Sequence, residues 1–311
     1  MGHHYVPQRY LRNFECPDNP GFTWQHDKRT GDTRLVSIKQ AAQARNYYEQ
    51  DVEQLLATEV ESPTNPIIDK LIAGTPIDAA ERHQLALYVA TMLMRVPAHR
   101  RKALEGYPGM VADFARNFRE QFESLIRSTP DADPAILARG RSELGAWAER
   151  HATFPPEYIL EQIRSPWPYR SSVAAIEQMT WRVARSAGPQ YFMTSDNPAF
   201  YFGSYGVGRV ESELSFPLST THALHGSWQA AGSLLVFVSV REGAVREINR
   251  RLASECERAF YFEQAPWLHK ILSKKRPFLS VIRWTDPPQW REPPAIDSDG
   301  ERHVVTSAAA G

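Results

Sequence analysis

Two adjacent histidines near the start of the chain, His3 and His4, are the residues best suited to acid–base chemistry. An imidazole changes charge near neutral pH, so it can act as a general acid, a general base or a metal ligand. Neighbouring residues of an extended segment point to opposite sides. At most one of the pair therefore faces a given site, and we favour His4, which is nearer the short helix predicted after Pro7. The competing interpretation is that both histidines only cover or cap the chain end.

A carboxylate and an amide, Asp196 and Asn197, follow a strand predicted over 191–194. Turn residues at the end of a strand often carry reactive groups, because the strand holds them in place. Asp196 offers acceptor oxygens, and Asn197 can donate or accept a hydrogen bond. An ordinary Asx turn is the alternative for this segment.

The third candidate is Arg95, which lies at the edge of an apolar helix face just before Pro97. Proline inside a helix is expected to kink it, and an arginine there usually holds a carboxylate or an anion with its planar fork. Glu59 and Glu61, on the preceding helix, are the expected structural partners. The alternative is that Arg95 binds the phosphate or carboxylate of a ligand.

The elements that must position these residues change type along the chain. Tyr10, Leu11 and Phe14 form the apolar side of the N-terminal helix, and residues 15–38 alternate as a hairpin. Helical periodicity then covers 51–164, with caps at Asp51 and Asp78. Strands are predicted over 179–187, 191–194, 211–219, 223–228 and 234–240, and a helix over 242–263. We expect an α+β fold, with a helical block followed by a mostly antiparallel sheet covered by a C-terminal helix.

The expected organisation is one continuous globular unit with four segments. These are an N-terminal motif and hairpin (1–50), a helical block (51–164), the sheet with its covering helix (169–285) and an extended tail (286–311). The break before the sheet is placed at Ser165-Pro166-Trp167-Pro168, and a helix is expected to begin at Pro155-Pro156.

Composition excludes several classes of protein. The 36 Lys and Arg balance the 36 Asp and Glu, so no global positive field attracts nucleic acid, although a local patch could. The two cysteines, Cys16 and Cys256, give no disulfide framework. No apolar run is long enough to span a membrane and no signal peptide is recognisable, so a cytoplasmic location without membrane contact is expected.

The opening His3-His4-Tyr5-Val6-Pro7-Gln8, followed by Tyr10-Leu11-Arg12-Asn13-Phe14, resembles the start of the bacterial DUF4238 domain of unknown function. Later segments resemble it in the same order: Asn46-Tyr47-Tyr48, Arg95-Val96-Pro97, Thr194-Ser195-Asp196-Asn197-Pro198 and Pro217-Leu218-Ser219. Arg9 departs from the pattern, since an aromatic residue is more usual there. The resemblance implies no reaction, but it supports the choice of residues.

The chain has no phosphate-binding loop, dinucleotide fingerprint, serine-hydrolase elbow or zinc-protease motif. The dispersed set that remains suits phosphoryl hydrolysis, and a nuclease or phosphodiesterase of toxin or defence type is the leading hypothesis. His4 would be the general acid or base, Asp196 a carboxylate that orients water or a metal ion, and Arg95 the phosphate anchor. Either Glu61 or Glu59 would assist. The expected substrate contacts are His3, Gln8, Tyr10 and Asn197.

Two other hypotheses stay open. In the first, the His, Arg and Asp residues form a buried network that docks the N-terminus, and the protein binds a ligand or partner without catalysis. In the second, His3, His4 and Asp196 hold a structural metal ion. A divalent metal cofactor is compatible with the hydrolase hypothesis, and a nucleic acid or nucleotide would be its substrate.

Overall fold

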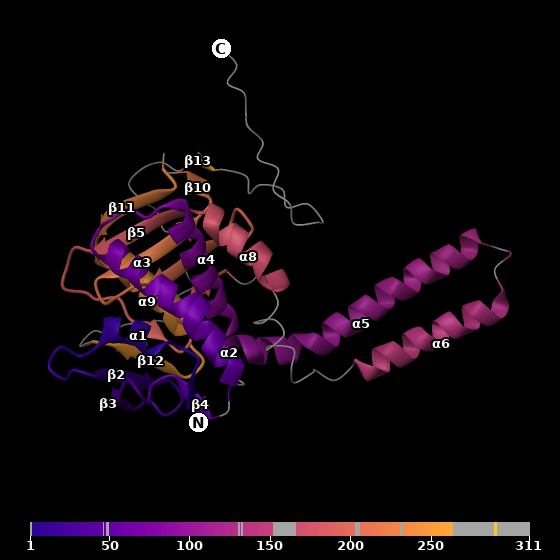
Figure 1. The fold of residues 1–311 in the computed structure, drawn as a ribbon, viewed down its shortest axis with the longest axis horizontal. Coiled ribbons are helices and arrows are strands. Elements are labelled where there is room, and N and C mark those ends of the chain that lie inside the picture. The colour runs from indigo at the N-terminus through magenta and orange to yellow at the C-terminus, as the bar shows by residue number, and fades with distance from the viewer. Residues whose placement is uncertain are drawn as a thin grey trace, which may run out of the picture. The chain divides into compact units, whose positions relative to one another are not determined.

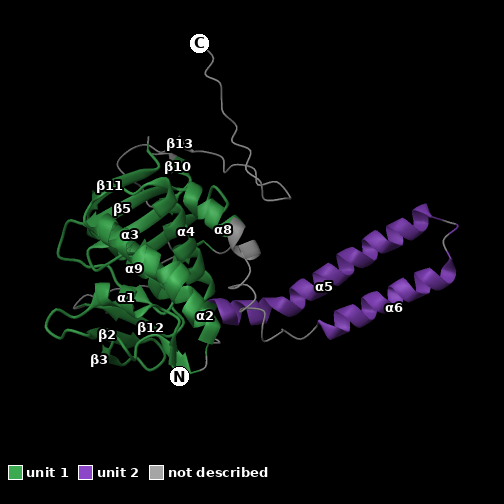
Figure 2. Ribbon diagram, in the orientation of Figure 1, with its two compact units in different colours: residues 1–98, 162–311 green, residues 99–161 purple. Residues whose placement is uncertain are grey.

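The computed structural model describes residues 2–45, 47, 50–129, 131, 133–151, 166–202, 206–230, 233–263 and 289–290. The chain divides into two compact units, one formed by residues 1–98 and 162–311 and the other by residues 99–161 (Figure 2). The helical block expected over 51–164 therefore contributes helices to both units. Among the described residues, no helix is both long and apolar enough to cross a membrane.

The N-terminal segment contains a short strand, a helix and a hairpin (Figure 1). Strand β1 (Gly2–His4) pairs antiparallel with β4 (Gln43–Arg45). Helix α1 (Gln8–Leu11) continues into a 3-10 turn (Arg12–Phe14), and its predicted apolar side is buried. Strands β2 (Phe22–Asp27) and β3 (Thr33–Ser37) form the predicted hairpin.

The next helical segment changes its winding part of the way along. Helix α2 (Gln50–Leu55) passes into a π-helical stretch, η2 (Leu56–Glu61), and then into α3 (Ser62–Ile72). The buried positions are spaced by four residues and are Val52, Leu56, Val60 and Thr64. Spacing by four drifts around an α-helix of 3.6 residues per turn, whereas the wider π turn keeps these positions on one side. Leu55 and Glu59 lie outside this row of buried positions, and both are exposed.

Helix α4 (Ala79–Met94) begins as predicted, with a capping box between Asp78 and Glu81. It ends at Met94 with Arg95 as its C-cap, and Pro97 begins a new helix, α5 (Pro97–Ser128), instead of kinking the old one. Helices α6 (Pro134–Arg150) and α8 (Pro166–Gln178) follow. The helix expected to start at Pro155-Pro156 lies outside the described residues. The tail from 286 does too, apart from β13 (Gln289–Trp290), which pairs with β10 (Gln229–Ala230).

The main sheet has five strands in the order β11-β5-β9-β8-β7. They are β5 (Thr180–Ser186), β7 (Phe200–Tyr201), β8 (Glu213–Pro217), β9 (His222–Ser227) and β11 (Leu235–Val240). Only the β11–β5 pair is parallel, so the expected mostly antiparallel sheet is confirmed.

A second sheet, in the order β3-β2-β12-β6, joins strands from the early and late parts of the chain. Its C-terminal strands are β6 (Thr194–Ser195) and β12 (Ala259–Phe262). The aromatic run Phe260-Tyr261-Phe262 was expected to end a helix, and this expectation is wrong. The helix, α9 (Glu242–Glu255), stops earlier, and the run pairs with β2 as a buried strand.

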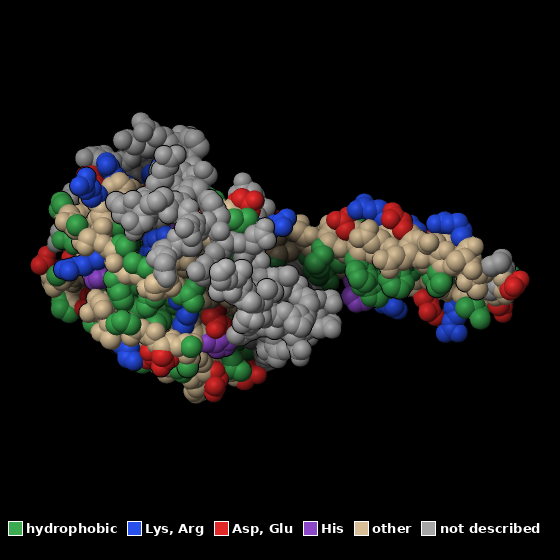
Figure 3. Space-filling model, turned by 90° about the horizontal axis from the view of Figure 1, so that it is seen from above, with side chains coloured by type: hydrophobic (Ala, Val, Ile, Leu, Met, Phe, Trp, Pro, Cys, Tyr) green, Lys and Arg blue, Asp and Glu red, His purple; other side chains and the backbone are tan. Residues whose placement is uncertain are grey.

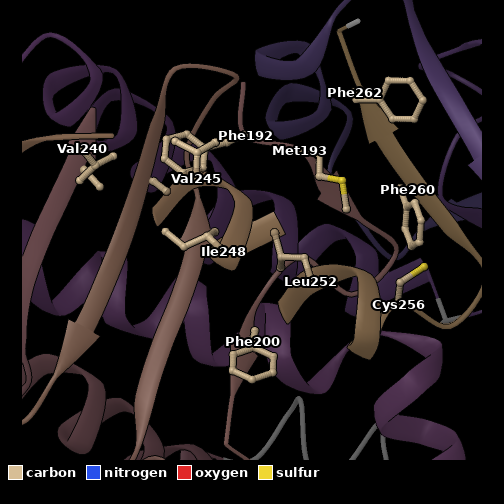
Figure 4. Close-up of a cluster of buried hydrophobic side chains, with 12 residues drawn as sticks. Phe192, Met193, Phe200, Val240, Val245, Ile248, Leu252, Cys256, Phe260 and Phe262 are labelled. Atoms are coloured by element: carbon tan, nitrogen blue, oxygen red, sulfur yellow. The ribbon is translucent and has the colours of Figure 1, made fainter. Parts of the chain in front are cut away.

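The main sheet is covered on both faces. On one face α9 contributes Val245, Ile248 and Leu252 to a buried cluster with strand residues such as Phe200 and Val240 (Figure 4). On the other face the guanidinium of Arg82, from α4, lies 3.8 Å from the ring centroid of Trp181. The predicted covering helix and α+β architecture are thus confirmed.

Candidate functional site

His4 is held in a defined orientation at the end of β1. The strand alternates, so that His3 is buried and His4 is half-buried. His4 Nε2 lies 3.1 Å from the carbonyl oxygen of Lys39, and the side-chain nitrogen of Gln8 lies 3.5 Å from Nδ1. Because a carbonyl oxygen can only accept, Nε2 carries the proton and Nδ1 carries the lone pair. The imidazole is therefore arranged as a base at Nδ1.

Arg95 connects this strand to the helices. Its guanidinium is only 1% exposed. NH1 lies 2.5 Å from Glu61 Oε1, and NH2 donates to the backbone carbonyl of His4. The sequence-based pairing of Arg95 with Glu61 is present. The described contacts of this buried guanidinium are thus with protein groups, the Glu61 carboxylate and the His4 carbonyl.

A second carboxylate, Glu53, belongs to the same region and was missed by the sequence reasoning. Glu53, Ala57 and Glu61 are spaced by four residues and are all partly buried, because the π-helical turn brings them to one side. Glu53 Oε2 is buried and has no hydrogen-bond partner among the described residues. Burial without a partner is costly for a carboxylate oxygen, and such groups recur at functional sites. By contrast, Glu59 is exposed, and its carbonyl accepts from Gln84.

The surroundings of His4 set its protonation. Burial is the main cause that lowers the pKa of His4 below 6.5, and the charge of Arg95 acts in the same direction. The Lys39 hydrogen bond and the carboxylates of Glu53 and Glu61 act to raise that pKa. The imidazole is consequently neutral at pH 7. If it takes up a proton, the carboxylates of Glu53 and Glu61 stabilise the positive charge.

Tyr10 is buried, and its contacts connect the N-terminal helix to the sheets. It is 1% exposed, and its hydroxyl lies 2.9 Å from Thr194 Oγ1 and 2.8 Å from the carbonyl oxygen of Pro217. The ring stacks on Phe216, with centroids 5.2 Å apart. Asn13, also from the opening motif, donates to the carbonyl of Leu218 at 2.8 Å. The motif therefore fastens α1 to the two sheets.

The side chain of Asp196 accepts hydrogen bonds from the backbone. The residue is 1% exposed. Its carboxylate accepts hydrogen bonds from the N–H groups of Glu257, Arg258 and Ala259, at 2.9, 2.6 and 2.9 Å. Burial raises the pKa of this carboxyl, and the three N–H groups act against the rise. This carboxylate fixes the turn between α9 and β12, which is a different set of contacts from that around His4.

Asn197 lies in the same turn, with its side-chain nitrogen 3.1 Å from the carbonyl oxygen of Glu255. None of the described contacts joins Asp196 to His4 or Arg95, the two residues with which it was expected to act. Three residues expected to share a metal ion, His3, His4 and Asp196, do not form a metal-binding group. Within the part of the chain that the structure describes, no cluster of three or more His, Cys, Asp or Glu could hold one.

A second charged cluster, beneath α9, was also missed. His225 Nε2 and Arg251 NH1 lie 3.2 and 2.8 Å from Glu213 Oε2, and Arg251 Nε lies 3.3 Å from Glu247 Oε1. Arg182 donates to Ser227 at 3.0 Å from the neighbouring strand. All five charged or titratable side chains are at most 3% exposed. Alternation along β8 and β9 could not reveal this cluster, because it puts Glu213 and His225 on the polar face, which is buried only because α9 covers it.

No curated protein and no solved structure shows significant similarity to this chain. A model of the family described as "Protein of unknown function (DUF4238)" matches residues 2–265, which include the opening motif, the His4 contacts and both sheets. The chain belongs to the DUF4238 family.

Proposed function

We propose that this protein is a hydrolase in which His4 is the general base. The observation that carries the proposal is the arrangement of its imidazole. Nε2 is bound to the Lys39 carbonyl, Nδ1 carries the lone pair, and burial keeps the ring neutral at pH 7. A neutral imidazole with an oriented lone pair can take a proton from water as that water attacks a substrate.

The carboxylates of Glu53 and Glu61 have a supporting part in this proposal. When His4 becomes an imidazolium ion, both negative charges stabilise it, because each acts to raise its pKa. Arg95 holds Glu61 and the His4 backbone in place. Gln8 approaches Nδ1 at the long end of hydrogen-bond distance, so a water molecule can displace its amide.

A phosphodiester of a nucleic acid or nucleotide is the proposed substrate class, in the setting of a bacterial toxin or defence effector. Arg95 is committed elsewhere, so the positive charge for a phosphate has to come from exposed residues near His4. Lys39 supplies the carbonyl that orients the imidazole, and Arg45 lies in β4 opposite β1; both are exposed. We assign phosphate binding to these two side chains.

The test measures hydrolysis of RNA, DNA and dinucleotides by the purified full chain. His4→Gln should lower the rate by roughly 100-fold or more, the usual contribution of a general base. His83→Gln is the matched control, because His83 is an exposed histidine paired with Glu177 and lies on α4. Lys39→Ala with Arg45→Ala should raise KM more than it lowers kcat. Absence of turnover on all three substrates, or full activity of His4→Gln, would overturn the proposal.

The second candidate is a binding protein without catalysis, and it is favoured by the structural contacts of Arg95, Tyr10 and Asp196. Under this alternative His4→Gln lowers the melting temperature but changes no rate. Induced expression separates the two further. A toxic hydrolase should arrest growth of the host, and His4→Gln should relieve the arrest while the folded protein accumulates to the same level.

A further inference from the structure

The unit formed by residues 99–161 is built as an antiparallel pair of helices, α5 and α6. The ring of Phe114 lies 5.0 Å from that of Trp147, and Arg141 forms an ion pair with Glu123 at 2.7 Å. A Cβ atom added at Gly140 would meet the ring of Phe122 at 2.5 Å. The two helices are therefore in close contact near Gly140, and their register is fixed.

The apolar positions of both helices follow a heptad spacing. In α5 they recur at steps of three and four residues, through Leu104, Tyr107, Val111, Phe114, Phe118, Phe122 and Leu125. In α6 the steps are the same, through Leu137, Gly140, Leu144 and Trp147. This spacing is typical of helices that wind around one another in coiled coils and four-helix bundles.

The packing of α5 against α6 leaves much of this apolar surface exposed. No side chain of α6 is fully buried. Met110, Phe114, Phe118 and Leu125 of α5, which we call the apolar stripe, are 51, 53, 49 and 61% exposed. At 100° per residue they fall within about 80° of one another, along roughly 22 Å of helix. Figure 3 shows hydrophobic side chains gathered along one side of these helices.

We propose that the apolar stripe binds the same stripe of a second copy of this chain, so that two helical pairs form a four-helix bundle. A single pair supplies two of the four helices of such a bundle, and a two-fold axis brings identical stripes together. The large side chains of the stripe present roughly 400 Å² of apolar area, about half of the ~800 Å² that each partner of a stable interface buries. The stems of the flanking charged side chains extend the contact.

The charges on these helices favour a second copy over a strongly charged partner. Acidic and basic side chains of these helices pair with one another, as in Arg116 with Asp113, Arg139 with Glu143 and Arg141 with Glu123. The surface therefore has no dominant sign that would select a nucleic acid or a basic protein. Self-association does not depend on the acid–base role proposed for His4.

The experiment measures the molar mass of the full chain by light scattering after size-exclusion chromatography over a wide range of concentration. The wild type should be a dimer whose dissociation constant rises at least about tenfold in Leu125→Glu and in Phe118→Glu, since each charge is placed at the interface twice. Phe22→Glu is the matched control. Phe22 is an exposed hydrophobic residue of the other unit, and this variant should dimerise normally.

Circular dichroism establishes that the variants keep their helices. A wild type that is monomeric at every concentration would overturn the proposal, and so would equal dimerisation of Leu125→Glu and Phe22→Glu. A monomer that sediments with uncharged phosphatidylcholine vesicles would assign the apolar stripe to a lipid surface instead.

Discussion

Arg95 donates a hydrogen bond to the backbone carbonyl of His4, a residue 91 positions earlier in the chain. The same guanidinium is paired with Glu61. One buried side chain thus joins the start of the chain, the π-helical stretch and the end of α4. Any role of His4 depends on this connection, because it fixes the backbone from which the imidazole extends.

Arg95→Lys should destabilise the fold by about 2–3 kcal/mol, because an ammonium group cannot reach both acceptors and leaves one buried group unsatisfied. Arg139→Lys is the control, since its pair with Glu143 is exposed on both sides and contributes little to stability. Urea denaturation measures both. Equal stability of the two variants would show that the Arg95 contacts are not important for folding.

Tyr10→Phe and Tyr88→Phe form a second comparison. Both tyrosines are buried, and both lie close to Phe216. The Tyr10 hydroxyl has two partners, whereas the Tyr88 hydroxyl has none among the described residues. Tyr10→Phe should cost about 1–2 kcal/mol, and Tyr88→Phe should be neutral or stabilising. Thermal unfolding monitored by circular dichroism would contradict this argument if it placed the two variants in the opposite order.

Asp196→Asn should lower the free energy of unfolding by roughly 2–3 kcal/mol. The charged carboxylate accepts three backbone hydrogen bonds with its two oxygens, whereas the uncharged amide has only one acceptor oxygen. Asp69→Asn is the control, as its ion pair with Arg9 is exposed on both sides. If Asp196 were instead a catalytic carboxylate, Asp196→Asn would keep its stability while losing activity, and calorimetry alongside the hydrolysis assay distinguishes these results.

The stability of the protein should fall as the pH drops below about 6.5. Burial lowers the pKa of His225, so the folded state keeps this imidazole neutral while the unfolded chain takes up a proton. The unfolded state then binds more protons, and stability present above pH 6.5 is lost as the pH falls toward the folded pKa. The pKa of His4, His26, His99 and His222 is lowered in the same direction.

His225→Gln should therefore reduce the pH dependence of the free energy of unfolding between about pH 7.5 and 5. His222→Gln is the comparison, because His222 is only partly buried and its contribution should be smaller. The slopes are compared, and not the absolute stabilities, since His225→Gln also removes the contact with Glu213. An unchanged slope in His225→Gln would contradict the assignment.

Local patterns in the sequence predicted much of this fold. The caps, turn residues and apolar periodicity placed the hairpin, α4 and the strands β5, β8, β9 and β11 of the main sheet, because each depends on neighbouring residues; the short strand β7 was not predicted. The pairing of β12 with β2 could not be predicted in this way. Phe260 and Tyr261 suit a helix end or a strand equally well, and distant residues decide between them.

The candidate site was predictable only in part. Alternation along β1 correctly separated His3 from His4, and a buried arginine before a proline correctly indicated a carboxylate partner. Glu53 was missed because an α-helical period places it away from Glu61, whereas the π turn brings the two to the same side. The hydrogen bonds of Asp196 could not be predicted, because residues 257–259, whose N–H groups it accepts from, are distant in sequence.

The order of the second sheet has a consequence for synthesis of the chain on the ribosome. The two central strands of this sheet, β2 and β12, are adjacent in space but come from opposite ends of residues 2–265, the region that matches the family. The early hairpin β2–β3 must therefore wait, with one edge unpaired, until residue 262 has left the exit tunnel. Such long-range pairing is slow and exposes nascent chains to aggregation. Ribosome-bound intermediates truncated before β12 should consequently recruit chaperones.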